Sequence, residues 1–551
     1  MKKLKLLLVM LALCALMVCA VLLGSVYAPV VGPCREIEEL WAIEDERMES
    51  GAPLVTALEN HGVPLAYDEQ ANTFYCTLGL EHGEEWPDIH LTAPGARGVT
   101  VCFADDYGYD WCDEAIREGY AYQLMAYTED EYAYFDIVFT GLPIISISTQ
   151  AEITTEDSPV QAAISDGDEG LKSFGRIHTR GGSTLSAEKM GYRLEFTRRA
   201  DGSRKVSQQV PGFGIADDII LLACASDGTK MRDRLSWDMY AMVTAEDESF
   251  GRRRTAYAEL FIDGQYEGIY LMVEPIDCEE ELAKAGEGHL FTDSVYRTAV
   301  LSLSRDRMYY AHPMGDNSGY ELYYAFESGH EFDHLFPYLE LVTQENDEAF
   351  CQKALACVDL DSALRYVLLV QAGGMTDNVF NNMYMWACST PQGMMYRFAP
   401  WDMDLTWGAK KEDIGQQFEN WMHFPVIDRM INLDAGGVMR EKLADTWAWM
   451  KEAAFNEENL ERLIARYAHE LGDSGAMARD AERWQTQMYD PDGYDIISFA
   501  AVRFMLLDYA VDAIVRAEGE PVKFLAESGY GEKGGSMLDT LAEMFRDGNL
   551  L

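Results

Sequence analysis

Short runs in which apolar and polar residues alternate characterise the first part of the chain. Clear examples lie at 73–78, 98–103 and 134–139, each rich in Val, Phe, Tyr or Thr. Because successive side chains of a strand point to opposite faces of a sheet, this pattern predicts β-strands. We therefore expect residues 29–141 to form a small β-rich N-terminal module.

A second set of predicted strands begins near Leu142. The polar segment 154–170 is predicted to be a linker, and strands at about 175–180 and 189–196 flank a glycine-containing turn at 181–184. Backbone amides in such a turn can approach phosphate oxygens, although most glycine-rich turns are only loops. The turn is therefore a candidate nucleotide contact and needs support from other motifs.

The clearest hairpin in the chain is the segment 257–274. The pair Asp263-Gly264, which suits a two-residue turn, separates two alternating runs. Glu274 ends the second run, where it either faces a ligand or is the first exposed residue past the sheet.

In the second half of the chain, apolar residues recur mainly at the spacing of an α-helix. Residues 361–373 are predicted to be a helix, and in 456–471 the apolar residues recur at the helical spacing. An earlier helix is predicted after Asp227-Gly228-Thr229, which can cap its first turn. Strands in front and helices behind predict an α+β chain with two lobes.

The most informative stretch runs from Asp377 to Gly408. Asn382 follows Asp377 by five positions, two apolar runs follow around a turn at 391–393, and the acids Asp402 and Asp404 come directly after the second run. A β-hairpin would bring these two acids back beside the Asp and Asn that precede its first strand. Three carboxylates and a carboxamide would then lie close together.

Phosphoryl transfer from a nucleotide needs such a set, because it depends on positioning and charge neutralisation. Asp377 has the type and place of the group that accepts the proton of the attacking hydroxyl, and Asn382 with Asp402 or Asp404 suits a divalent ion. The alternative is that these are ordinary turn residues. The second acidic cluster favours the functional interpretation, because acids in an apolar run are costly to bury without a cation or donors.

Composition narrows the choice of partners. The 551 residues are 48% hydrophobic and 12% aromatic, which is ample for packed cores in about two to four domains. The formal net charge is -49, from 93 acidic against 44 basic residues. This balance argues against nucleic acid as a partner, since nucleic-acid binding relies on clustered Lys and Arg. It suits divalent cations and basic protein segments instead.

The amino terminus has the pattern of an export signal. Three lysines, at positions 2, 3 and 5, precede an apolar run over 6–23. A peptidase site fits near residue 28, and the run is also long enough to span a bilayer. Residues 1–28 are therefore predicted to be a signal peptide or an N-terminal membrane anchor. The protein would then be extracytoplasmic, either secreted or anchored to the outer face of the membrane.

Several ordered motifs lie within residues 142–515. They are Arg180-Gly181-Gly182-Ser183-Thr184 with Lys189-Met190-Gly191-Tyr192-Arg193, the helix start Asp227 to Asp233, the hairpin Ile262 to Glu274, the pair Asp377 and Asn382, and Pro400-Trp401-Asp402-Met403-Asp404 with Gly408. These segments resemble the motifs of the spore-coat protein H (CotH) kinase family of atypical secreted protein kinases, in which the helix-start motif ends in Arg-Asn. Together these motifs are specific, whereas any one alone would be weak.

The resemblance implies a two-lobed, atypical protein-kinase-like fold with a β-rich N-lobe at about 142–340 and a helical C-lobe at about 341–515. A C-terminal helical tail at 516–551 is expected outside the matching segment. The resemblance also implies transfer of the ATP γ-phosphate to Ser or Thr of a secreted or surface protein, with Mg²⁺ or Mn²⁺ as the metal. Carried over by motif, the catalytic residue is Asp377, the metal residues are Asp402, Asn382 and Asp404, and the nucleotide residues are Arg180, Gly181, Ser183, Lys189, Arg193 and Glu274.

Three positions depart from the family pattern. Gly182 replaces an Asn, Met190 interrupts a Lys pair, and Glu195 stands where a second basic residue is frequent. These departures keep open a catalytically silent, kinase-like surface or coat protein that acts in adhesion or assembly. A hydrolase with paired carboxylates is a third alternative, but two acids at i and i+2 do not flank a scissile bond. The kinase interpretation expects Asp377, Asn382 and Asp402 around one ion, opposite the turn at 181–184.

Overall fold

The structure is a computed structural model of the full chain. It describes residues 28–79, 89–104, 119–181, 187–244, 252–276, 294–299, 320–325, 333–343, 346–378, 381–390, 393–409, 421–422, 424–485 and 490–522. The predicted leader before residue 28, the site residue Ser183 and most of the predicted helical tail lie outside these ranges. No helix within them is long and apolar enough to cross a membrane.

The chain divides into two compact units, and each contains segments that are distant in sequence. The first comprises Met1–Ala223, Ala256–Val273 and Ala468–Gln487, and the second comprises Cys224–Thr255, Glu274–Tyr467 and Met488–Leu551. Both units mix helices and strands, which agrees with the predicted α+β class. The boundaries drawn from sequence at 28, 141, 340 and 515 remain predictions.

The amino-terminal part of the first unit is built on a seven-stranded sheet in the order β1-β8-β9-β10-β6-β5, with β2 paired to β10. Its strands are β1 (Gly32–Arg35), β2 (Met48–Glu49), β5 (Ala66–Asp68), β6 (Thr73–Thr77), β8 (Thr100–Ala104), β9 (Ala121–Tyr127) and β10 (Glu131–Thr140), beside a small sheet of β3 (Glu59–Asn60), β4 (Val63–Pro64) and β7 (Leu91–Thr92) and the helix α2 (Ile37–Glu46). The predicted strands near 73, 98 and 134 are therefore confirmed as β6, β8 and β10.

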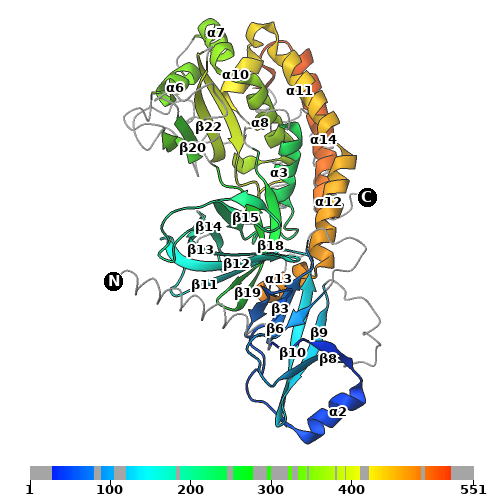
Figure 1. The fold of residues 1–551 in the computed structure, drawn as a ribbon. Coiled ribbons are helices and arrows are strands. Elements are labelled where there is room, and N and C mark those ends of the chain that lie inside the picture. The colour runs from blue at the N-terminus through cyan, green and yellow to red at the C-terminus, as the bar shows by residue number, and fades with distance from the viewer. Residues whose placement is uncertain are drawn as a thin grey trace, which may run out of the picture. The chain divides into compact units, whose positions relative to one another are not determined.

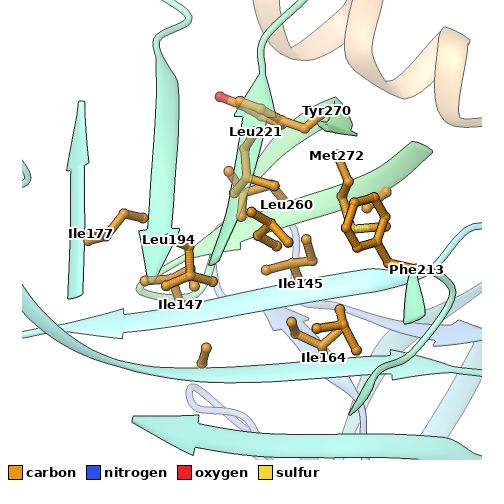
Figure 2. Close-up of a cluster of buried hydrophobic side chains, with 14 of the residues drawn as sticks. Ile145, Ile147, Ile164, Ile177, Leu194, Phe213, Leu221, Leu260, Tyr270 and Met272 are labelled. Carbon is orange, nitrogen blue, oxygen red and sulfur yellow. The ribbon is translucent and has the colours of Figure 1, made fainter. Parts of the chain in front are cut away.

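A closed barrel follows in the order β11-β12-β13-β14-β17-β19-β18. Its strands are β11 (Ile144–Thr149), β12 (Ser158–Asp166), β13 (Glu169–Arg180), β14 (Gly191–Thr197), β17 (Asp218–Leu222), β18 (Thr255–Ile262) and β19 (Gln265–Val273), with a small sheet of β15 (Gln208–Val210) and β16 (Gly214–Ala216) between β14 and β17 in sequence. Figure 2 shows the core of buried Ile, Leu, Phe, Tyr and Met side chains that these strands enclose. Closing the barrel removes the exposed sheet edges that invite wrong pairing.

The predicted linker at 154–170 is wrong, because most of it is β12. Val160, Ala162 and Ile164 alternate toward the core, while the residues between them are exposed or half-buried. The outward positions include the apolar residues Pro159 and Ala163 as well as Gln161, so the alternation of apolar and polar residues was obscured. Pairing with β11 and β13 on either side completes the hydrogen bonding of the strand.

The predicted hairpin at 257–274 is confirmed as β18 and β19. Asp263 and Gly264 both have positive φ, +48° and +74°. That backbone suits the tight turn that matches the twist of two antiparallel strands. Beside β19 lies α13 (Ala476–Trp484), drawn in orange among the strands of the first unit in Figure 1. This helix comes from far along the chain.

The second unit contains a four-stranded sheet in the order β21-β20-β22-β23, formed by β20 (Ser294–Ala299), β21 (Tyr320–Ala325), β22 (Asn381–Thr390) and β23 (Gly393–Pro400). Its helices are α3 (Arg232–Val243), α6 (Leu335–Thr343), α7 (Asp347–Cys357), α8 (Leu360–Gly373), α10 (Pro425–Asn432), α11 (Met439–Ala453), the start of α12 (Glu457–Asp473) and α14 (Tyr494–Arg516), with the 3₁₀ turns η3 (Thr376–Asn378) and η5 (Ala435–Gly437). The predicted helices at 361–373 and 456–471 correspond to α8 and α12.

Helix α8 delivers the chain to the candidate site. The Asp359 side chain caps its first turn by accepting the Ser362 N–H at 3.1 Å, and Gly374 ends it in a left-handed conformation. Most of its length is buried. A buried, capped helix gives a fixed starting point to the turn η3 that carries Asp377.

Candidate active site

The hairpin β22–β23 brings the two ends of the acidic stretch together. Its register pairs Met383 with Pro400, so Asn382 lies opposite Trp401. The Trp401 N–H donates to the Asn382 carbonyl at 2.9 Å, which extends the pairing by one step. The acids after β23 therefore begin beside Asn382, which lies at the start of β22 and not before it.

Asp377 and Asn382 are joined directly. The Asn382 side-chain N–H donates to Asp377 Oδ2 at 2.8 Å. Asn378 braces both segments, because its amide N–H donates to the carbonyls of Asn382, at 3.2 Å, and Trp401, at 2.7 Å. Asn382 has a positive φ of +52°, a conformation that Asn tolerates better than most residues. The carboxylate is thus held at one oxygen by a neutral donor.

Asp402 and Asp404 occupy the loop after β23. Asp402 is exposed and has a φ of +51°, while Asp404 is half-buried and accepts the Ser226 hydroxyl at 2.9 Å. Burial, followed by the negative charge of Asp402, raises the pKa of Asp404 to about 7. Asp377 also contributes to this rise. Asp377, Asp402 and Asp404 therefore share one electrostatic environment.

A further acid, Asp233, lies in the first turn of α3 and reaches the same loop. It is only 4% exposed, and its carboxylate accepts the Met403 N–H at 3.4 Å. Burial, followed by the charges of Asp402 and Asp404, raises its pKa well above the usual value. Nearby, Asp227 accepts the Arg232 N–H at 2.9 Å and pairs with the Arg232 guanidinium. Asp227 therefore binds the first N–H group of α3 from outside the helix, whereas the N-cap position itself is Met231.

The donor set fits a divalent cation. Within the described ranges, Asp377 and Asp404 each have a neutral side-chain partner and no basic one. Acids crowded in this way need a positive charge, and carboxylate and amide oxygens are ligands of Mg²⁺ and Mn²⁺. The described part of the chain contains no group of three or more His, Cys, Asp or Glu side chains that could hold a metal ion by themselves. Mg²⁺ commonly takes one or two carboxylates together with substrate phosphates, which matches these residues.

Removing one of these charges is expected to stabilise the metal-free protein. The raised pKa of Asp404 means that the folded state holds this proton more tightly than the unfolded state, so the associated stability is present below about pH 4 and lost as the pH rises to about 7. In EDTA at about pH 8, Asp404→Asn should therefore raise the melting temperature by about 2–4 °C.

At about pH 4 the same variant and the wild type should melt together, because the wild-type carboxyl is then protonated. Asp445→Asn, on the exposed face of α11, is the control and should be neutral at both pH values. Differential scanning fluorimetry measures both effects. A lower melting temperature for Asp404→Asn in EDTA at about pH 8 would contradict the crowded-acid interpretation.

The predicted nucleotide residues lie mainly in the first unit. Arg180 ends β13 and is half-buried, and Gly181 follows with a φ of +127°. Arg193 pairs with Asp218 across β14 and β17, and Lys189 is buried against other residues of the barrel and α13. Their roles remain predictions, as does their position opposite Asp377.

Glu274 is the one predicted nucleotide residue in the second unit. Its carboxylate accepts the Arg254 guanidinium at 3.1 Å, and its side chain is 40% exposed. Glu274 directly follows Val273, the last residue of β19, which agrees with the alternative that it lies just past the sheet. Nothing in these contacts assigns it to a ligand.

Sequence reasoning missed Ser226, Asp233 and Asp480. Ser226 gives no signal, since a serine before an Asp-Gly turn is ordinary. Asp233 stands where the resemblance expects Asn, so that difference could have marked it as an extra acid beside the site. Asp480, which pairs with Lys189, lies 291 positions away from it and carries no local motif.

The fold and the site point first to a class of protein. A mixed α+β chain with an Asp–Asn pair on one side of a hairpin and an acidic loop on the other has the groups that kinase-like proteins use. The family CotH kinase protein matches residues 177–503, so this chain belongs to the CotH kinase protein family. The membership confirms the resemblance read from the motifs and indicates a kinase-like spore coat protein. A search of curated proteins gives no match.

Proposed function

We propose that this protein is an exported, ATP-dependent protein kinase that phosphorylates Ser or Thr of secreted or surface proteins. The observation that carries the proposal is the hydrogen bond between Asn382 and Asp377 beside the loop of Asp402 and Asp404. Family membership supports kinase activity in general. A two-lobed, kinase-like fold is part of the proposal.

Asp377 is the proposed proton acceptor. Asn382 holds Oδ2 of this carboxylate, which leaves Oδ1 to accept the proton of a Ser or Thr hydroxyl. The hydroxyl oxygen forms a bond to the γ-phosphorus while the bond from that phosphorus to the leaving ADP oxygen breaks. The proton passes from the hydroxyl to Oδ1, and a positioned base of this kind contributes about 10²–10⁴-fold to a rate.

Asp402 and Asp404, with Asn382, would hold Mg²⁺ or Mn²⁺, which when bound supplies positive charge to the phosphates of ATP. Ser226 orients one oxygen of Asp404. Asp402 is exposed and can reach a ligand from its left-handed backbone position. Lys189, Arg180, Gly181, Ser183, Arg193 and Glu274 remain the proposed contacts to the nucleotide.

The location and partners of the protein are also proposals. The lysine-rich start and the apolar run after it support export, with the N-terminal segment either removed or in contact with a membrane. The excess of 93 acidic over 44 basic residues supports basic segments of secreted or coat proteins as substrates and argues against nucleic acid.

The test is incubation of the full chain with γ-labelled ATP and Mg²⁺ or Mn²⁺, with a basic Ser/Thr-containing protein as acceptor. We expect label on Ser or Thr of the acceptor or of the chain itself, located by mass spectrometry. Asp402→Asn should abolish the labelling, because it removes a metal carboxylate. Wild-type protein that takes up no label with either metal would favour the silent coat-protein alternative.

A further inference from the structure

Helix α13 meets the barrel through charged side chains. Asp480 is one of the few buried residues of this helix. Three ion pairs join the helix to the rest of the same unit, and two of them are Arg479 with Glu259 and Arg483 with Glu267. The third is the pair of Asp480 with Lys189. The side chains of Lys189 and Asp480 are 4% and 2% exposed, so this third pair is the most enclosed.

Lys189 and Asp480 close a ring with the backbone of β19. The Lys189 ammonium donates to the Ile269 carbonyl at 2.7 Å and to Asp480 Oδ1, and the same Oδ1 accepts the Ile269 N–H at 2.9 Å. The ammonium also lies 4.9 Å from the centre of the Tyr270 ring. Each group fixes the next, so the position of the lysine nitrogen is determined by Asp480.

Two more features show that the backbone is shaped around this pair. Gly268 has a φ of +90°, and a Cβ at this position would clash with Asp480 Oδ1. Figure 2 shows Tyr270 at the edge of the core cluster with its hydroxyl directed away from the other labelled side chains. That hydroxyl donates to the Met190 carbonyl at 3.0 Å, next to Lys189 in the chain.

A buried ion pair of this kind is not explained by stability alone. Apolar side chains of similar volume often stabilise a core as well as or better than a buried pair of charges. A lysine that must stay charged and fixed, however, needs a carboxylate partner when it is removed from water. Lys189 is the lysine that the motifs assign to the nucleotide, so the cost of burying its charge has a functional reason.

We propose that Asp480 is a positioning residue, which fixes the ammonium of Lys189 for its contact with the nucleotide, and that α13 is the element that carries it. The inference rests on the proposed function and goes beyond it, because it assigns a role to a helix from far along the chain. Asp480 acts through Lys189 and touches no substrate itself.

The experiment measures binding of MgATP to the full chain by isothermal titration calorimetry. Asp480→Asn can still accept the Ile269 N–H but lacks the charge that holds Lys189, and it should weaken MgATP binding by about tenfold or more. Arg483→Gln is the matched control. It breaks the more exposed pair with Glu267 on the same helix and should change the affinity by about twofold at most.

A double-mutant cycle separates positioning from general loosening of α13. Adding Asp480→Asn to Lys189→Met should change the MgATP affinity by about twofold at most, because Asp480 acts only through the lysine. If Asp480→Asn does not fold, the MgATP affinity of Asp480→Glu tests the inference instead. Its extra methylene displaces the ammonium, and a weakening of about threefold or more is expected.

The inference would be overturned if Asp480→Asn, or Asp480→Glu when it is used instead, bound MgATP with wild-type affinity. The proposed kinase function would then remain intact. An equal loss in Arg483→Gln would also overturn the inference, since α13 would then be only structural. Tighter binding in Asp480→Asn would mean that Asp480 competes with phosphate, again against the inference. A wild-type chain that binds no MgATP would contradict the proposed function, and this inference with it.

Discussion

Asp377→Asn is expected to reduce phosphotransfer by about a thousandfold while the protein stays folded. The amide cannot accept the proton of the attacking hydroxyl, and a positioned base contributes about 10²–10⁴-fold. The substituted side chain keeps an oxygen for the Asn382 N–H, so the turn η3 should hold its shape. Initial rates with γ-labelled ATP measure the loss, and far-UV circular dichroism checks the fold.

The control for this prediction is Asp445→Asn, which makes the same chemical change on the exposed face of α11 in the same unit. Its rate should equal that of the wild type within about twofold. Equal rates for Asp377→Asn and the wild type would show that the proton acceptor is another group. A loss of activity accompanied by unfolding would show that Asp377 is needed for structure instead.

Glu259→Gln is expected to destabilise the barrel by about 3–5 kcal/mol, because it leaves the buried charge of Arg479 without its partner. Glu259 is fully buried, accepts two Arg479 donors at 2.8 and 3.1 Å on one oxygen, and also accepts the Tyr266 hydroxyl at 2.6 Å. Burial is the largest single influence on the pKa of the Arg479 guanidinium and lowers it, but the Glu259 carboxylate, together with Tyr266 and Tyr75, raises this pKa above its usual value.

Hydrogen–deuterium exchange of the amides of β18 and β19 measures this effect within the first unit, without requiring the whole chain to unfold in one step. Glu39→Gln is the control, because its pair with Arg35 on α2 is exposed and such pairs contribute about 0–1 kcal/mol. Unchanged exchange in Glu259→Gln would mean that Arg479 finds other partners and that this network does not hold α13 to the barrel.

Local signals made the hairpins and the acidic site predictable from sequence. The turn Asp263-Gly264 identified β18 and β19, and the two apolar runs around 391–393 identified β22 and β23. The register of β22 and β23 then followed from the shortness of the turn, which is why Asn382 was expected beside the acids. In both hairpins the alternation of apolar residues and the type of turn residue indicate the same structure. Contacts with other parts of the chain were therefore not needed to predict them.

The unpredicted features depend on contacts between distant parts of the chain. Strand β12 is stabilised by its neighbours β11 and β13 more than by its own few apolar residues, so its sequence resembled a linker. The pairing of Lys189 with Asp480 joins positions 291 residues apart. The amphipathic pattern of α13 predicts a helix with one buried face, but no motif in it indicates that this face packs on the barrel, because its partners lie far away in the sequence.

The central claim is that Asp377, Asn382, Asp402 and Asp404 form the metal and phosphotransfer site. The most direct test is an anomalous difference map from crystals grown with Mn²⁺ and a non-hydrolysable ATP analogue. We predict a manganese peak within about 2.5 Å of a carboxylate oxygen of Asp402 or Asp404, with the analogue's phosphates on the same ion. Nucleotide and manganese bound elsewhere, with these acids in contact only with protein and water, would contradict the account.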